Sequence, residues 1–586
     1  MYQNKEDLRL STMHTGAKAL ALLVGSALAL SACATSSDES GDTESSGGTA
    51  AATIKLGYAQ EFSAYNMVTE DGVTLANGAV LNGLLRGFNY FGPDGKVTAD
   101  TEFGTYEKTS DKPLTVKYSI NPKAVWSDGK PVDCDDMVLT WLANSTATGE
   151  SGFSTAAPAG YEQMKKPQCK AGDKDVTVVY TEPFADWDAM FNWTSILPAH
   201  IVEQQGGLTK SIIDLADKPK DAGLKKAIEF YNKGWQLNPG TLKKEIMPSM
   251  GPYTIDSWTA GQSLVLKPNK SWWGTPPKSD TIIYRFIADD AQSQALQNGE
   301  INIMKPQPQV DILNQLKNQG DKVRYETGVE YSYEHLDFNF KGVFADKRIR
   351  QAFALCVPRG DLINNLIKPL APEAKIYESR MIYTFQPGYD EFIKGNGHET
   401  YDSVNIDKAK SLLKAAGKTK VKVRLGWRKN PSAPNKRRTD TVTLLQSSCN
   451  KAGFEITDTG KDSFFEKELP SGQWDVAMFA WSGSPLVTSL PGLYQSKSGG
   501  QGGQNNGQYS NKTVDQLMNK LNRELDKDKQ TQIMKQVDTL LWTDLATIPL
   551  YEFPAITATD TKVENVKPNA TQQDITWNVH EWTLKE

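Results

Sequence analysis

The chain has 586 residues, which is more than one hydrophobic core usually supports, so we expect two or three lobes. Its 65 basic and 70 acidic residues give a net charge of −5, and the basic residues are spread along the sequence. We therefore expect no nucleic-acid partner.

The first 33 residues are typical of an export signal. Three basic residues precede an apolar run, 19–30, that is shorter than the roughly 20 residues needed to span a bilayer. The run ends in Leu30-Ser31-Ala32-Cys33, which resembles a bacterial lipobox. This resemblance implies that Cys33 is lipidated and becomes the mature N-terminus. An ordinary signal peptide, cleaved before Ala34 or later, is the alternative.

Residues 34–52 are rich in Ser, Gly and acidic residues, with almost nothing to bury. Such a composition predicts a flexible linker between an anchor and a folded body. Translation starts at Met1 or at Met13, since the sequence after Met13 still contains a basic residue and the whole apolar run.

Residues 251–303 show the clearest local pattern. Alternating apolar residues predict a hairpin from Tyr253 to Leu266, and a β-branched run, 281–287, predicts a further strand. A helix is expected from Asp289 or Asp290 to Asn298-Gly299, followed by a strand at Ile301 and Ile303. This order of elements is typical of an α/β protein.

The same stretch also carries specific sequence words. They are GPY at 251–253, then WTAG, LVLKPN with the pair Trp272-Trp273, and ALQNGEINI at 295–303. Together they resemble the extracellular solute-binding proteins of peptide importers, family 5, which includes the oligopeptide and dipeptide-binding proteins. The resemblance extends through WSDGKPVDCDDMV at 126–138, LPAH at 197–200 and IPLY at 548–551.

The resemblance implies an α/β, two-lobed periplasmic-binding-protein-like fold of the cluster C type, with an extra subdomain in lobe I. We expect lobe I at 53–285, with its subdomain at about 91–180, lobe II at 286–547, and a return to lobe I at 548–586. The two crossings are expected near Tyr284–Ala288 and Ala546–Leu550. The ligand would lie in the cleft between the lobes.

Four cysteines remain after Cys33, an even number in an exported chain, and three pairings are possible. We favour Cys134–Cys169 and Cys356–Cys449, because each bond then lies within one lobe and leaves the lobes free to move. Four free thiols are the alternative, which export makes less favourable. The four histidines beyond the signal segment are scattered, so we expect no metal site and no cofactor.

In the resembled family, the loop after the first strand supplies polar groups to the ligand. The corresponding side chains here are Glu61, Ser63, Tyr65 and Asn66, for which a simple surface turn is the alternative. The strand 333–340 (YEHLDFNF) alternates polar and apolar residues, and Asn339 lies where the family has its Phe-Asn pair. Asn339 is therefore a further ligand-binding candidate.

Trp481 ends a predicted buried strand and is followed by Ser482, Gly483 and Ser484. Peptide-binding members have an aspartate at the position of Ser484, and that aspartate pairs with the ammonium of the bound peptide. A buried ammonium without such a partner costs several kcal/mol. We therefore expect an extended, largely neutral ligand, an oligopeptide above all, whose N-acetylation has a less than tenfold effect, unless another acid such as Glu61 holds the amine.

The resemblance implies a monomeric lipoprotein on the extracellular face of the cell membrane that delivers a solute to ABC permease subunits and is not an enzyme. A secreted hydrolase is the first alternative, but the sequence has no Gly-x-Ser-x-Gly elbow, Cys-His pair or metal cluster. A cell-envelope regulator with a vestigial cleft is the second alternative.

Overall fold

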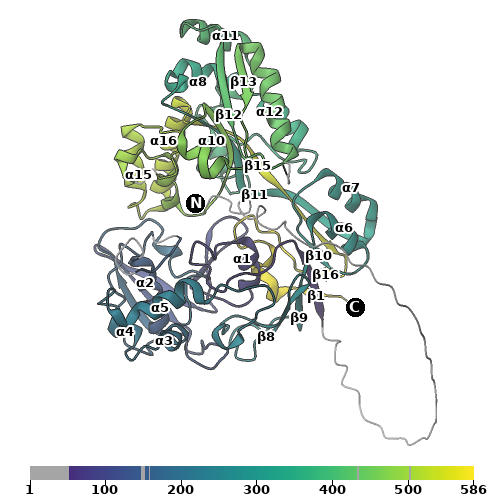
Figure 1. Cartoon of the computed structure of the whole chain (residues 1–586). Helices are drawn as coiled ribbons and strands as arrows, with labels where there is room; N and C mark the ends of the chain where they lie inside the picture. The colour runs from purple at the N-terminus through teal and green to yellow at the C-terminus, as the bar shows by residue number, and fades with distance from the viewer. Residues whose placement is uncertain (1–51, 147–151, 157–158, 432–434, 501–502, 586) are drawn as a thin grey trace, which may run out of the picture.

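The computed structural model describes residues 52–146, 152–156, 159–431, 435–500 and 503–585. One ten-stranded mixed sheet runs through both halves of the molecule, in the order β13-β12-β14-β11-β15-β10-β1-β9-β8-β7 (Figure 1). Its strands are β1 (Thr53–Tyr58), β7 (Tyr253–Thr259), β8 (Ser263–Pro268), β9 (Thr281–Phe286), β10 (Ile303–Met304), β11 (Val323–Phe338), β12 (Val421–Gly426), β13 (Phe454–Asp458), β14 (Val476–Ser482) and β15 (Thr547–Asp560).

Two long strands, β11 and β15, connect the halves. The first half of β15 pairs with the second half of β11, which in turn pairs with β14. The far end of β15 pairs with β10, and β10 pairs with β1. The β11–β15 register shifts between Val329 and Tyr333, so the irregularity lies midway between the two halves.

The first lobe is built around β1 and the strands that follow it. Its large apolar core also contains C-terminal residues, among them Ile575 and Trp582. A separate three-stranded sheet of β4 (Gly104–Asp111), β5 (Leu114–Ile120) and β6 (Asp175–Val179) forms part of this lobe. Its helices are α1 (Leu75–Leu81), α2 (Cys134–Ser145), α3 (Ala199–Gly206), α4 (Ile212–Leu215) and α5 (Lys225–Glu229).

The second lobe has a core on each face of its part of the sheet. One face packs under α8 (Lys347–Ala354), α11 (Ile406–Ala415) and α12 (Lys436–Cys449). The other packs against the segment around α10 (Tyr389–Ile393) and against α14 (Pro491–Tyr494), α15 (Lys512–Leu521) and α16 (Lys527–Asp544). Two helices, α6 (Asp289–Gln297) and α7 (Val310–Gln319), cover a smaller cluster beside the crossing strands.

The predicted elements of residues 251–303 are confirmed as β7, β8, β9, α6 and β10. The first crossing, predicted near Tyr284–Ala288, stays a proposal. Because β9 and β10 both pair with β1, the chain is still in the first-lobe sheet at Met304 and leaves it along β11. The lobe limits stay a proposal, and the pairing favours a boundary within β11 and β15.

Both predicted disulfides are present, Cys134–Cys169 and Cys356–Cys449. The first joins the start of α2 to the chain just before β6, within the first lobe. The second joins the chain after α8 to the end of α12, within the second lobe. Neither bond connects the two lobes, so neither opposes a movement of one lobe against the other.

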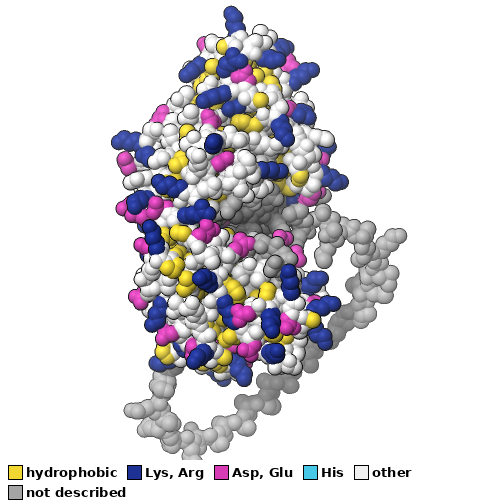
Figure 2. Space-filling view, turned by 90° about the vertical axis from the view of Figure 1, so that its left-hand side faces the viewer, with side chains coloured by type: hydrophobic (Ala, Val, Ile, Leu, Met, Phe, Trp, Pro, Cys, Tyr) yellow, Lys and Arg dark blue, Asp and Glu magenta, His cyan; other side chains and the backbone are white. Residues whose placement is uncertain are grey.

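Acidic and basic side chains are mixed over the face drawn in Figure 2, with no large patch of one sign. Among the helices of the described residues, none has the length and apolar character to cross a bilayer.

Candidate ligand-binding site

Trp481 lies near the carboxyl end of β14, a strand that is buried from Val476 to Trp481 because both faces of the second-lobe sheet are covered. Its indole stacks on His335, with ring centroids 5.7 Å apart and an interplanar angle of 15°. Phe479 meets the indole edge-on at 5.0 Å. These contacts fix the orientation of the ring, which forms one wall of a pocket.

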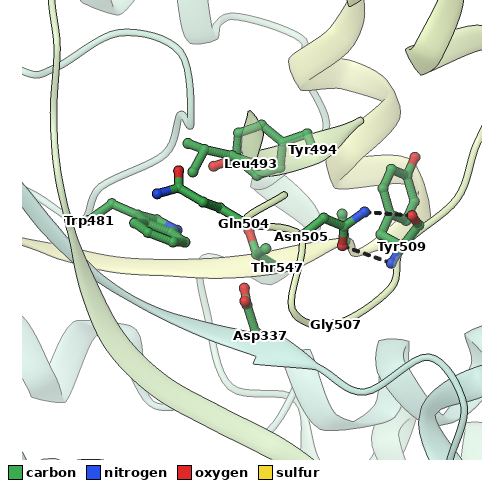
Figure 3. Close-up of a pocket in the computed structure, with 10 residues that line it drawn as sticks. Asp337, Trp481, Leu493, Tyr494, Gln504, Asn505, Gly507, Tyr509 and Thr547 are labelled. Carbon is green, nitrogen blue, oxygen red and sulfur yellow. Dashed lines mark hydrogen bonds between the residues drawn. The ribbon is translucent and has the colours of Figure 1, made fainter. Parts of the chain in front are cut away.

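The pocket beside Trp481 is small, with a volume of about 10 Å³, which is space for about one water molecule. Trp481, Tyr494 and Tyr509 give it aromatic walls, and Asp337 reaches it from β11. Figure 3 shows the Asp337 carboxylate pointing toward the space enclosed by Trp481, Gln504 and Thr547. The pocket therefore combines aromatic surfaces with one acid.

His335 and Asp337 lie two residues apart on β11 and so share one face of the sheet. His335 Nε2 is 3.2 Å from Asp337 Oδ1, but the two atoms do not have the geometry of a hydrogen bond. Within the described residues, both ring nitrogens of His335 and Oδ1 of Asp337 are buried without a hydrogen-bond partner. Both side chains are more than nine-tenths buried, which makes these unpaired atoms costly.

A group of tyrosines adjoins this pair. The hydroxyl groups of Tyr333 and Tyr494 are 2.7 Å apart and hydrogen-bonded. Burial raises the pKa of both hydroxyls, so both remain protonated at neutral pH. The pocket wall therefore supplies neutral polar groups, and the charge in it comes from Asp337.

The turn after Trp481 has little free space. The Gly483 amide donates to the Tyr331 carbonyl, and a Cβ atom on Gly483 would lie 2.4 Å from the Tyr383 hydroxyl. Only glycine fits this position without a shift of Tyr383. The half-buried Ser482 pairs with Ser332 on β11.

Ser484 takes part in the turn itself. Its Oγ accepts a hydrogen bond from the Leu486 amide at 3.2 Å, and its carbonyl accepts one from the Tyr331 hydroxyl at 3.2 Å. No charge is present at this position, so any anionic partner for a ligand amine must come from another residue.

Glu61 is held at the outer end of the first-lobe sheet. Its carboxylate accepts hydrogen bonds from Trp258 Nε1 at 3.0 Å and from the Gly261 amide at 2.9 Å. It thereby closes the turn between β7 and β8. Both partners belong to the first lobe, which leaves Glu61 committed to the hairpin in this structure.

The other candidates of this loop also have first-lobe partners. The Ser63 amide donates to Asn77 Oδ1 at 2.8 Å, the buried Tyr65 hydroxyl donates to the Pro248 carbonyl, and Asn66 Nδ2 donates to the Tyr231 carbonyl at 2.9 Å. Asn339, in the second lobe, donates to the carbonyls of Gly472 and Trp474 at 3.0 and 2.9 Å. These side chains stabilise loops, and their contact with a ligand stays a prediction.

The two lobes also touch through segments outside the ten-stranded sheet. Asp186, from the segment after β6, accepts hydrogen bonds from the Thr488 amide at 2.9 Å, from Thr488 Oγ1 at 2.7 Å and from the Val487 amide at 3.3 Å. Its side chain is buried, which raises its pKa. Nearby, Glu182 pairs with Arg523 and Asp188 with Lys527, at 2.6 and 3.1 Å.

One cluster has the ligand types of a metal site: Glu378, His398 and Asp402. The guanidinium of Arg359, however, contacts Glu378 at 2.6 Å and Asp402 at 3.1 Å. A fixed cation between the two acids already balances their charge and would repel a metal ion. We assign no metal to this cluster.

Sequence analysis did not single out His335, Asp337 or Asp186. The first two were visible as polar residues that alternate with apolar ones along 333–340, but their burial on a covered face was not. Asp186 gave no signal, because its partners are about three hundred residues away in the chain.

The two joined α/β lobes, the two crossing strands and the pocket at a strand end define a two-lobed solute-binding protein. The family comparison agrees: the model "Bacterial extracellular solute-binding proteins, family 5 Middle" matches residues 101–504. The chain belongs to this family, whose members serve ABC importers.

Curated relatives match nearly the whole chain. An uncharacterised lipoprotein of Mycobacterium tuberculosis is 29% identical over 553 residues, which cover 92% of this chain and 94% of the relative. The oligopeptide-binding protein OppA of the same species is 26% identical over 526 residues, covering 86% of this chain and 80% of OppA.

Solved structures show the same fold. The periplasmic EDTA-binding protein EppA has a TM-score of 0.79 at 22% identity, covering 92% of this chain and 98% of EppA. AppA of Bacillus subtilis, in complex with a nonapeptide, has a TM-score of 0.67 at 20% identity, covering 91% of this chain and 99% of AppA. NikZ of Campylobacter jejuni, in complex with Ni(L-His), has a TM-score of 0.67 at 18% identity, covering 91% and 99%.

Proposed function

We propose that the protein captures an extracellular oligopeptide between its two lobes and delivers it to the permease subunits of an ABC importer. The observation that carries this proposal is the position of Trp481, an oriented aromatic wall at the end of a buried strand beside an enclosed pocket. The peptide assignment is supported by the relatives named as oligopeptide-binding proteins and by the nonapeptide complex of AppA.

An extended peptide suits this position for a general reason. Main-chain groups at the end of a strand pair with the backbone of an added strand whatever its side chains are, while aromatic walls bind side chains of many kinds. Further peptide contacts are proposed in this mode, either through main-chain groups or after the lobes open. They are made by Ser482, Gly483, Ser484 and Asn339, and by the loop residues Glu61, Ser63, Tyr65 and Asn66.

Delivery requires release, and the crossing strands provide a place for a hinge. The β11–β15 register shift lies within the crossing strands, whereas the contacts of Asp186 join other segments of the two lobes. A ligand that contacts both lobes favours the closed arrangement.

The signal segment and the relatives support a proposed location. Cys33 lies outside the described residues, and we propose that it is lipidated, which holds a monomeric protein on the outer face of the membrane. The relatives named as lipoproteins support this arrangement. One acyl chain alone binds a membrane weakly, so two or three chains on Cys33 are expected.

Native mass spectrometry of protein taken from the cells that produce it tests the peptide assignment. A retained solute adds a mass that collisional activation releases, and tandem fragmentation of that mass is expected to give a peptide sequence. Trp481→Ala, purified in parallel, is expected to retain less of it. A released mass with the composition of a metal chelate or an opine would replace the peptide assignment with that solute.

A further inference from the structure

We propose that Asp337 forms a subsite for a primary ammonium group of the captured solute. This inference rests on the proposed function and names a chemical group that the solute carries. It concerns the pocket beside Trp481, where the structure leaves an acid without a hydrogen-bond partner.

The chemistry of the pocket is that of a site for an organic cation. Asp337 brings a carboxylate that is 6% exposed, and its Oδ1 has no hydrogen-bond donor among the described residues. A carboxylate in such a place is stabilised by a cation that can donate to it. The rings of Trp481, Tyr494 and Tyr509 present π faces and edges around the same space, which favours an ammonium over a neutral polar group.

One buried cation of the second lobe, Arg380, is already used. Arg380 donates to Thr547 Oγ1 and to the Thr547 carbonyl, lies over the Trp542 ring, and is 3.5 Å from the carboxylate of Asp538. Its charge is therefore balanced by Asp538. Asp337 has His335 as its ion-pair neighbour, at 3.2 Å and without hydrogen-bond geometry.

The size of the pocket and its ligand atoms distinguish an ammonium from a metal ion. About 10 Å³ holds one group the size of a water molecule, which an ammonium head fills. A protein metal site takes four or more ligand atoms, whereas Asp337 is the charged ligand among the residues that line this pocket, next to hydroxyls of Tyr494 and Tyr509 that burial keeps protonated. The Asp337 carboxylate accepts a hydrogen bond from an ammonium.

This subsite would replace the acid that is absent at Ser484. Ser484 is engaged with the Leu486 amide and Glu61 with the β7–β8 turn, so neither is available in this structure. Asp337 is on β11, directly beside the strand that ends at Trp481, and both residues line the same pocket.

The ammonium can come from a peptide N-terminus or from a lysine side chain, and three peptide libraries separate these sources. The first has a free N-terminus and contains no Lys, Arg or His. The second is N-acetylated and carries one Lys, and the third is N-acetylated with no cationic residue. Each library is mixed with the full-length protein after the protein has been purified, unfolded and refolded. The bound peptides are quantified by native mass spectrometry.

One of the first two libraries carries the amine that the subsite recognises. We expect the third library to bind at least tenfold more weakly than that library. Asp337→Asn is expected to remove that difference, while Asp217→Asn, an exposed first-lobe acid that pairs with Lys166, leaves it unchanged. Thermal melting of each variant verifies folding, and the wild-type comparison stands without any variant.

Equal binding of all three libraries by the wild type would overturn the inference. That result is expected if His335 and Asp337 form an ion pair that needs no further cation. Loss of the preference in Glu61→Gln but not in Asp337→Asn would place the amine at Glu61 and also overturn it. If no library binds, the peptide assignment itself fails and this inference falls with it.

Discussion

The carboxylate of Asp186 in the first lobe accepts two hydrogen bonds from Thr488 in the second, one from its amide and one from its hydroxyl. The two residues are 302 positions apart in the chain, and the acid is almost completely buried by the contact. With the ion pairs of Glu182 and Asp188, this contact joins the lobes outside the ten-stranded sheet.

Asp186→Ala is expected to weaken ligand binding by about tenfold or more, because hydrogen bonds to a charged group are worth about 1.5–3 kcal/mol and a factor of ten is about 1.4 kcal/mol. The lost contacts exist only when the lobes touch, so the dissociation rate should rise more than the association rate falls. Surface plasmon resonance with a bound peptide measures both rates. Asp217→Ala, whose partner Lys166 is in the same lobe, should change neither, and unaltered dissociation in Asp186→Ala would show that the contact does not hold the closed form.

Glu552→Gln is expected to stabilise the protein at alkaline pH. Burial raises the pKa of Glu552 to about 7, although Thr384 donates to it through its amide and hydroxyl groups. The folded chain thus keeps this proton while the unfolded chain loses it near the ordinary pKa of about 4.3, so stability falls as pH rises from that value to about 7 and is constant above. The loss amounts to about 4 kcal/mol.

Glutamine has no charge to lose, and its carbonyl and amide groups still meet Thr384. Urea unfolding at pH 5 and pH 8 should therefore show the variant more stable than the wild type at pH 8 and closer to it at pH 5. Glu107→Gln, an exposed acid on β4, serves as the control. A Glu552→Gln protein that is less stable at pH 8 would contradict the assignment of a buried, proton-holding acid.

Reduction of the disulfides should destabilise each lobe separately. Loop-closure entropy predicts about 3–4 kcal/mol for the 35-residue separation of Cys134 and Cys169, and about 4–5 kcal/mol for the 93-residue separation of Cys356 and Cys449. In each of two variants, both cysteines of one disulfide are replaced by serine, and the variant is unfolded in urea. The variant without Cys134–Cys169 should lose less stability than the variant without Cys356–Cys449. Equal stability with and without reductant would show that the bonds are absent in the mature protein.

Replacement of Cys33 by Ser should release the protein into the medium of its producing cells, because the proposed acyl chains provide the membrane anchor. Fractionation with immunoblotting of wild type and variant measures the distribution. Replacement of Ser31 by Ala keeps the cysteine and is expected to leave the protein with the membrane. Retention of the Cys33→Ser protein would mean that another segment anchors it.

Local pattern was sufficient for much of the fold. The hairpin of β7 and β8 was predictable because alternating apolar residues and a glycine turn are adjacent in the sequence. The disulfide pairing followed once the family resemblance had divided the chain into lobes. The pairing of β10 with β1 did not follow, because the two strands are far apart in the chain and β10 has only two residues.

The site was predictable to a smaller extent. Trp481 could be placed at a pocket because the strand before it is uniformly apolar and ends at a Ser-Gly-Ser-Pro turn. Glu61 could not be excluded from the sequence, since its partners Trp258 and Gly261 are about two hundred residues away. The sequence shows that His335 and Asp337 are polar. It does not show that they lack hydrogen-bond partners among the described residues, because that depends on how the chain packs.

The central claim is that the lobes close on a captured solute, and small-angle scattering tests it most directly. The solute-free wild type should have a larger radius of gyration than the same protein saturated with a peptide identified by native mass spectrometry. Asp186→Ala should start at the larger value and contract less under the same peptide concentration. Identical scattering profiles of the wild type with and without saturating peptide would contradict the claim.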